Sequence, residues 1–328
     1  MLNKDAQLVS DPFSSKLLKQ STRDGFGKGT VEAGKADPQI VVLSADLKES
    51  TRAEWFQKEF PDRYIEMGVA EQNMATVAAG LAAVGKIPFI TSYAAFSPGR
   101  NYEQIRTTIA LNNVPVKICG MHAGVSVGPD GATHQMLEDM AMMRALPNME
   151  VLNPCDAEEA RKATMEAAKN GKPVYLRFGR SNVPVFTTLE TPFEIGKARI
   201  LWESEKPSVL IAGTGALSYN ALLAARALDA EGVGSLVLHF GTVKPLDRDA
   251  LQVAATKVRV VVTVEEHQIA GGFGSAVAET LSETHPIKVI RLGLRDEFGQ
   301  SGDPDELIAH YGLSPSGIKE AVHHALLP

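Results

Sequence analysis

Short runs rich in β-branched residues alternate with alanine-rich stretches along the chain, and this alternation constrains the fold most strongly. In the first half, the runs expected to be strands lie at residues 40–46, 86–92, 114–120, 149–154 and 172–178. The stretches expected to be helices lie at about residues 70–84, 101–112, 136–146 and 156–169. The last begins at Asp156 and has two glutamates in its first turn, where an N-cap and the helix dipole favour them. This pattern is typical of βαβ units around a parallel sheet.

The pattern lapses between Gly179 and Gly196, where prolines and threonines occur without a helical period, as in a linker. A second α/β unit follows, with strands expected at 208–213, 234–240, 258–266 and 287–293 and helices near 217–230, 271–283 and 303–311. We therefore expect an α/β protein of two domains. The expected boundaries are an N-terminal extension at 1–20, a parallel-sheet domain at 21–180, a linker at 181–196 and a smaller α/β domain at 197–328.

Composition excludes several classes of protein. The 328 residues, 44% of them apolar, are enough for two cores. The net charge of −6 is spread over interspersed acids and bases, which argues against a nucleic-acid or anionic-lipid partner. Cys119 and Cys155 are the only cysteines and lack zinc-site spacing, so we expect no metal site in this chain. No export signal or membrane span is apparent, and a cytoplasmic protein is expected.

Glu71 is the most informative single residue. It opens an otherwise apolar helix within the segment MGVAEQNM. A carboxylate among alanine, valine and methionine is costly to bury unless it has a partner. One interpretation is a carboxylate at the start of a helix whose only role is a favourable interaction with the helix dipole. The other is a functional acid.

Two further features lie just after expected strands. Tyr93 and Phe96 flank a pair of alanines where the ligand loops of α/β domains gather, although such aromatic pairs also serve as plain core. Further on, a glycine-rich loop carries His122, Asp130 and His134. Loops of this kind carry function more often than packing. A metal site there would need a third ligand with suitable spacing, which the sequence does not supply.

The segments PDRYIEMGVAEQNM and PFITSYAAF strongly resemble transketolases, and the resemblance runs from about Ser21 to the end of the chain. It implies a thiamine diphosphate pyrimidine-binding domain followed by a transketolase C-terminal domain. Glu71 would contact N1′ of the aminopyrimidine and share its proton, which turns the 4′-amino group into an imino base. Tyr93 and Phe96 would stack on the same ring. Asp46 and Leu47 fall where the family approaches the cofactor.

The loop from Met121 to Gln135 resembles the transketolase substrate loop. The resemblance implies that His122 and His134 contact the hydroxyls or the carbonyl of the sugar and are catalytic residues together with Glu71. It implies that Asp130 recognises the stereochemistry of one hydroxyl. The residues that match phosphate-binding positions are Arg23, Ser50 and Arg180. Guanidinium groups suit phosphate because they form paired charge-assisted hydrogen bonds. It stays open whether Arg177 competes with Arg180 for the phosphate-binding role. It also stays open whether Tyr102 is a third aromatic of the site, because one extra residue lies between Ser97 and Arg100.

One expected motif is missing. Thiamine enzymes hold the diphosphate through Mg²⁺ with a Gly-Asp-Gly motif and paired asparagines, which this chain lacks. The resemblance therefore implies a separate N-terminal transketolase subunit that binds pyrophosphate and Mg²⁺. The expected enzyme is a heterotetramer, containing a dimer of this chain, that moves a two-carbon ketol unit between ketose and aldose phosphates, as in the pentose phosphate pathway. The C-terminal domain would shape the subunit interface rather than carry chemistry.

Three alternatives remain open at the level of sequence. The β subunit of a 2-oxo-acid dehydrogenase has the same two-domain length, but it has no need of a cluster suited to phosphorylated sugars. A deoxyxylulose phosphate synthase usually carries arginine in place of His122. A non-catalytic transketolase-like scaffold has no reason to keep Glu71, Tyr93 and Phe96.

Overall fold

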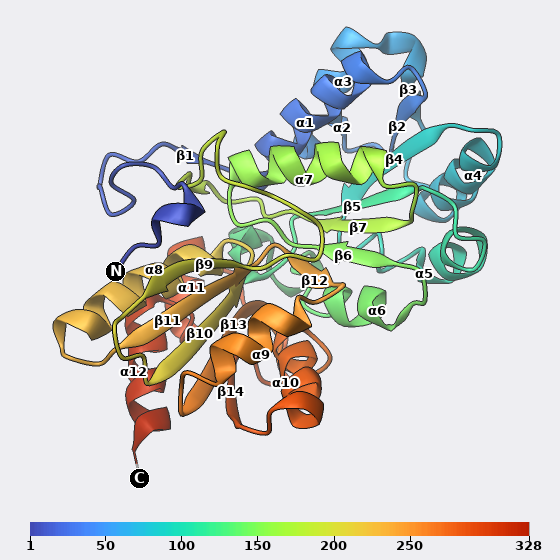
Figure 1. Ribbon diagram of the computed structural model, residues 1–328. Coiled ribbons are helices and arrows are strands. Elements are labelled where there is room, and N and C mark those ends of the chain that lie inside the picture. Colours follow the sequence, from blue (N-terminus) through green and yellow to red (C-terminus); the bar gives the residue numbers. More distant parts are fainter. Residues whose placement is uncertain (328) are drawn as a thin grey trace.

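The computed structural model describes residues 1–327, which form two α/β domains, each built on its own sheet (Figure 1). The larger sheet has seven strands in the order β12-β6-β7-β5-β4-β2-β3. All neighbouring pairs in it are parallel except β12 and β6. Its strands are β2 (Ile40–Ser44), β3 (Tyr64–Glu66), β4 (Ile87–Tyr93), β5 (Lys117–Met121), β6 (Glu150–Leu152), β7 (Val174–Arg177) and β12 (Thr242–Lys244).

Helices cover both faces of this sheet because alternate strand residues point to opposite sides. Ile40 and Val42 of β2 pack beneath one helical layer, whereas Val41 and Leu43 pack beneath the other. The first layer contains α1 (Thr22–Ala36), α3 (Ala53–Glu59) and α7 (Ala157–Lys169). The second contains α4 (Glu71–Ala83), α5 (Tyr102–Gln104), a π-helix (Ile105–Ala110) and α6 (Asp139–Ala145). The shorter helix α2 (Lys48–Thr51) and a 3₁₀ turn (Pro61–Arg63) join β2 to β3.

The smaller sheet belongs to the second domain and has the order β14-β13-β10-β11-β9. Its strands are β9 (Arg199–Glu203), β10 (Val209–Thr214), β11 (Ser235–Phe240), β13 (Val260–Gln268) and β14 (Lys288–Leu294), of which β9 alone runs antiparallel to its neighbour. The helices of this domain are α8 (Leu217–Ala230), α9 (Arg248–Ala255), α10 (Phe273–Thr284), α11 (Pro304–His310) and α12 (Pro315–Leu326).

The two domains exchange elements. Strand β12 follows β11 of the smaller sheet in the chain, yet it pairs with β6 at the edge of the larger sheet. The N-terminal segment crosses in the other direction, because Leu2 forms a bridge with Trp202 of β9. A short ribbon of β1 (Lys19–Gln20) and β8 (Val183–Pro184) ties this segment to the stretch between the domains.

Most expected elements are confirmed, with one correction of type and two of extent. The strand expected from residue 114 begins at Lys117. The expected helix at 101–112 is a short α-helix followed by a π-helix. In the π-helix the hydroxyls of Thr107 and Thr108 donate to backbone carbonyls four residues earlier, and such hydrogen bonds often bend helices. The helix expected from residue 136 begins at Asp139, because Met136 instead forms a bridge with Ala123.

Helix α1 was not predicted, since its four glycines oppose a helix on propensity. The structure gives the reason for them. A Cβ added at Gly25 would lie 2.0 Å from the Ala157 carbonyl oxygen, and one at Gly29 would lie 2.8 Å from the Arg161 carbonyl oxygen. Gly25 and Gly29 thus let α1 lie directly against α7, and Figure 1 shows the two helices side by side. Gly27 and Gly34 make room for Trp55 and Phe56 of α3.

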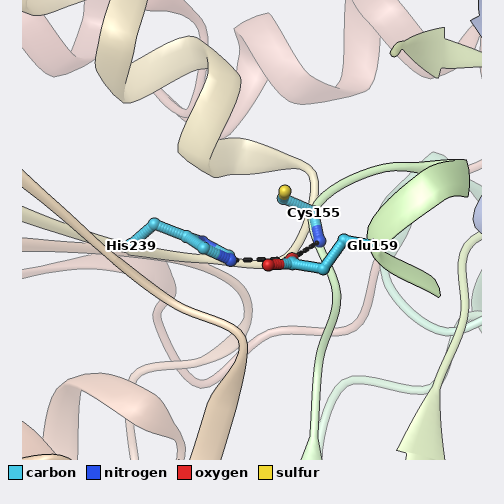
Figure 2. A group of neighbouring side chains, drawn as sticks. All are labelled: Cys155, Glu159 and His239. Atoms are coloured by element: carbon cyan, nitrogen blue, oxygen red, sulfur yellow. Dashed lines mark hydrogen bonds and ion pairs between the residues drawn. The ribbon is translucent and has the colours of Figure 1, made fainter. Parts of the chain in front are cut away.

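A buried polar network joins α7 of the first domain to the second sheet (Figure 2). Glu159 Oε2 lies 2.8 Å from Nε2 of His239 and accepts the Cys155 amide at 2.7 Å, while Oε1 accepts from Arg199 at 3.2 Å. The other imidazole nitrogen of His239 is hydrogen-bonded to Ser218 at 2.6 Å. His239 and Arg199 hold the pKa of Glu159 well below its usual range against the opposing effect of burial. This carboxylate is therefore a charged link between the domains.

Removing that link should weaken the whole chain. We expect Glu159→Ala to lower the free energy of unfolding by about 3–5 kcal/mol, because His239 and Arg199 lose their buried partner. Denaturant titration of the purified chain measures the loss, with Glu158→Ala, on the same helix turn but more exposed, as the control. A loss no larger than that of the control would contradict this role for Glu159.

Candidate active site

The residues singled out in the sequence gather at the carboxyl ends of the parallel strands of the larger sheet. Asp46 and Leu47 follow β2, Tyr93 ends β4, and His122 follows β5. In open α/β sheets this edge is where ligands bind. The topology therefore brings distant parts of the chain to one place.

Glu71 is the first residue of α4, and only 1% of it is exposed. Its Oε1 accepts a hydrogen bond from Ser92 Oγ at 3.2 Å, and its Oε2 accepts one from Arg100 Nη1 at 2.5 Å. Asn101 donates to its backbone carbonyl at 3.0 Å. The carboxylate is thus buried with partners and does not point into water.

Four rings form one cluster beside this carboxylate. Tyr93 stacks on His122 with ring centroids 4.0 Å apart and on Phe96 with centroids 5.9 Å apart. His134 meets Phe96 edge-on at 5.5 Å. These are separations of rings in direct contact, so no third ring fits between Tyr93 and Phe96. A flat ligand has only an outer face of the cluster on which to stack.

Arg100 occupies such a face. Its guanidinium carbon lies 4.7 Å from the centroid of Phe96 while Nη1 bonds to Glu71. The side chain remains 44% exposed. A planar group with N–H donors thus stacks on Phe96 and hydrogen-bonds to Glu71.

His122 links the rings to a basic group. Its Nε2 lies 3.0 Å from Arg23 Nη1, and the same nitrogen of Arg23 donates to the Ser50 carbonyl at 2.8 Å. His122 adopts a left-handed backbone with φ of 54°, uncommon for a residue other than glycine and frequent at functional sites. Among the described residues, Nδ1 of His122 and Nε of Arg23 are buried without a hydrogen-bond partner.

The electrostatics of this corner favour an anion. Burial, followed by repulsion from Arg52, lowers the pKa of Arg23, and Arg180 adds to the effect. A cavity of about 280 Å³ lies here, with Arg23, Arg180 and Asn182 in its lining. Guanidinium groups that repel one another around an open space are stabilised by a ligand of negative charge.

The glycine-rich loop lies over the same corner as an irregular 3₁₀ segment, Val125–Thr133. Arg180 donates to the Val127 carbonyl at 2.7 Å and lies 3.6 Å from Asp130. Arg177, by contrast, is buried and is held by Asp139 at 2.8 Å. Of the two arginines, only Arg180 faces the cavity.

The remaining sequence candidates are dispersed. Asp46 has φ of 59° and donates its amide to Glu66 at 2.8 Å, and Leu47 precedes α2. Tyr102 packs against the main core and lies 3.4 Å from the Met142 carbonyl through its hydroxyl, away from the ring cluster. Ser50 contributes its carbonyl, not its hydroxyl, to Arg23.

Cys155, Glu159 and His239 are the one group in the described part of the chain with three potential metal ligands close together. Metal binding needs a thiolate. Burial and then the neighbouring carboxylates raise the pKa of the Cys155 thiol well above its usual value. Glu159 already accepts three hydrogen bonds, so the chemistry of this set favours a polar link over a metal centre.

Sequence reasoning missed Arg100 and Ser92 as partners of Glu71. The buried acid itself was the available signal, since such a carboxylate requires a donor nearby. Nothing in the sequence indicated which of the neighbouring residues would supply it.

Comparisons with known proteins agree with the two-domain fold. Residues 19–185 match the family model described as transketolase, pyrimidine binding domain, and residues 196–318 match that of the transketolase C-terminal domain. A putative transketolase C-terminal section from Methanocaldococcus jannaschii is 42% identical over 92% of this chain and 94% of its own length. The 6-deoxy-6-sulfo-D-fructose transketolase subunit SqwH of a Clostridium species is 38% identical over 96% of this chain and 97% of its own.

A solved structure described as a split gene transketolase, inactive β4 tetramer, superimposes with a TM-score of 0.86. It is 45% identical and covers 93% of this chain and 98% of its own. Fold and site therefore define a two-domain α/β protein whose first domain is of the kind that binds the pyrimidine of thiamine diphosphate. The chain belongs to the transketolase family and corresponds to a split-transketolase subunit.

His122 should stay neutral near pH 7. Burial, and then Arg23 and Arg180, lower its pKa to about 3. The unfolded imidazole titrates near pH ~6.5, so the stability linked to His122 is present above that pH and is lost as pH falls toward 3. Between pH 7.5 and 5 the wild type should lose about 2 kcal/mol more than His122→Asn in denaturant titrations. Equal losses would contradict a buried neutral imidazole.

Proposed function

We propose that this chain is the pyrimidine-binding subunit of a thiamine diphosphate-dependent transketolase that moves a two-carbon ketol unit between sugar phosphates. The observation that carries the proposal is Glu71, a buried acid beside an aromatic cluster. Through His122 that cluster reaches Arg23, which lines a basic cavity. No plain packing role requires a carboxylate, four rings and two arginines at one edge of the sheet. Sugar interconversion of the pentose phosphate type fits this site.

The residues fit the aminopyrimidine. Arg100 stacks on Phe96 and donates a hydrogen bond to Glu71, which are the two kinds of contact that a flat, nitrogen-bearing ring would make. When bound, the cofactor supplies the electron sink for cleavage of a carbon–carbon bond. Glu71 would hold and share a proton at the ring nitrogen, and Ser92 would keep its carboxyl oriented from Oε1.

The basic cavity would receive the anionic end of the substrate. Arg23 and Arg180 line it, and the unpartnered nitrogens of Arg23 and His122 are ready donors or acceptors. Neutral His122 and His134 would contact the oxygens of the sugar, and Asp130 would accept from a hydroxyl. Phosphate and sulfonate share the charge and oxygens that guanidinium groups recognise, and the substrate named for the relative SqwH is a sulfonated sugar.

A partner subunit would complete the enzyme. This sequence lacks the Gly-Asp-Gly motif through which Mg²⁺ and diphosphate are held, and Mg²⁺ prefers oxygen ligands that include phosphate. The similar split-gene tetramer is described as inactive in its β4 form. We propose a heterotetramer in which an N-terminal subunit binds Mg²⁺ and pyrophosphate and this chain forms the central dimer.

The basic cavity also separates this proposal from its rivals. A 2-oxo-acid dehydrogenase acts on a small substrate that has no use for Arg23 and Arg180 around one cavity, with Asp130 beside Arg180. A scaffold has no use for a buried Glu71. The synthase-like alternative is disfavoured because His122, not an arginine, fills the position over Tyr93.

Reconstitution tests the function. We expect this chain, mixed with the N-terminal subunit of its own source, thiamine diphosphate and Mg²⁺, to transfer ketol units, with Glu71→Gln reducing kcat roughly 10²–10⁴-fold. The exposed Glu190→Gln serves as the control. Activity of this chain alone would refute the split enzyme, and full activity of Glu71→Gln would refute the role of the acid.

Arg100 should compete with the cofactor for Glu71 and Phe96. We expect Arg100→Met to bind thiamine about 10-fold more tightly than the wild type in the isolated chain, because the ring no longer displaces a charged partner. Arg100→Lys, which keeps the charge without the flat stacking group, should fall between them. Isothermal titration measures all three, and weaker binding by Arg100→Met would mean that Arg100 helps to hold the ring.

A further inference from the structure

Glu266 lies in the second domain, on β13, but its side chain reaches the substrate loop of the first. Its Oε1 accepts the backbone amide of Ser126 at 2.5 Å. The carboxyl also packs against Gly124, where an added Cβ would lie 2.4 Å from Cδ of Glu266. With φ of 90°, Gly124 is in a conformation that favours glycine. The loop therefore begins on a surface supplied by the other domain.

The loop has little regular structure of its own. Gly128 and Gly131 interrupt the 3₁₀ segment with non-helical backbone, so its amides and carbonyls need partners elsewhere. Ser181 donates to the Ser126 carbonyl at 2.7 Å, whereas Glu266 accepts from the Ser126 amide. Residue 126 is thus held through both of its backbone groups.

The second domain supports the loop at further points. Nε2 of Gln135 bonds to the carbonyls of Val125 at 3.1 Å and Gln300 at 2.9 Å, which ties the base of the loop to the segment after β14. An added Cβ at Gly131 would lie 2.4 Å from Ser301 Oγ. The contact at Gly131 is one residue from Asp130.

Glu266 is itself fixed in place. Arg177 donates to its backbone carbonyl at 2.8 Å and is in turn paired with Asp139 at 2.8 Å. The side chain lines a cavity of about 210 Å³ that Ser126 and Ser181 also line. No other part of the proposed chemistry uses this buried carboxylate. Its partner is the amide at the start of the substrate loop.

We propose that Glu266 is a positioning residue that sets the conformation of the substrate loop, and with it the placement of Asp130 and His134. The C-terminal domain would then take part in substrate recognition, beyond the interface role expected from the sequence. The hydrogen bond between Glu266 and the Ser126 amide is seen in the structure. Its effect on sugar binding rests on the proposed function.

Hydrogen exchange on the isolated chain tests the bond without any need for activity. We expect the amides of residues 125–128 to exchange about 10-fold faster in Glu266→Ala, because the Ser126 amide loses its acceptor. Glu266→Gln retains an acceptor oxygen and should stay close to the wild type. The exposed Glu320→Ala is the matched control in the same domain.

Exchange in β10 separates local from global effects. Unchanged protection of residues 209–214 in Glu266→Ala, together with faster exchange in the loop, would support the proposal. Faster exchange in both segments to the same degree would overturn it, since Glu266 would then only stabilise the fold. Unchanged exchange of the loop would also overturn it.

Kinetics of the reconstituted enzyme test the consequence. Glu266→Ala should raise KM for the aldose phosphate about 10-fold and change kcat less than about 3-fold, because the loop contributes binding groups more than the reacting acid. A fall in kcat with unchanged KM would overturn the assignment to substrate positioning. If the wild-type pair transfers no ketol units, the proposed function fails, and hydrogen exchange still decides whether Glu266 holds the loop.

Discussion

A buried carboxylate must have hydrogen-bond partners, and the residues that supply them to Glu71 form the centre of the site. Ser92 and Arg100 supply the two hydrogen bonds, and Asn101 holds the backbone of the same residue. These partners lie at the end of β4 and in the turn that follows, which also carries Tyr93 and Phe96. The segment that supplies partners to Glu71 therefore also positions Tyr93 and Phe96 beside it. Tyr93 in turn stacks on His122.

The sequence predicted the inner strands of both sheets because they are short, β-branched and regularly spaced, and burial on both faces leaves little choice of residue. It did not predict the edge strands β3, β9 and β12. It also predicted Asp156 as a helix cap, and the Asp156 side chain accepts the Glu159 amide at 2.9 Å. It failed for α1, whose glycines lower helix propensity and are explained only by close packing against α7 and α3. Contacts between distant segments are not visible in local propensity.

The candidate site shows the same division. Glu71, Tyr93, Phe96, His122 and the loop were found from motifs, because their chemistry is unusual at those positions. The choice between Arg177 and Arg180 could not be made from the sequence, since Arg177 ends β7 and Arg180 lies just beyond it. Tertiary pairing separates the two arginines, because Asp139 holds Arg177 in the interior and Arg180 lines the cavity. Glu266 was passed over because its partner is a backbone amide 140 residues away in the chain.

The edge strand β12 has a consequence for the autonomy of the first domain. Its residues, Thr242–Lys244, cover the border of the larger sheet at β6. A fragment ending before them would expose unpaired amides and carbonyls along β6, a surface on which sheets add strands from other molecules. During synthesis the first sheet stays open on that side until the chain has extended past Lys244, well into the second domain. A cut between β8 and β12 would therefore separate the larger sheet from its own edge strand.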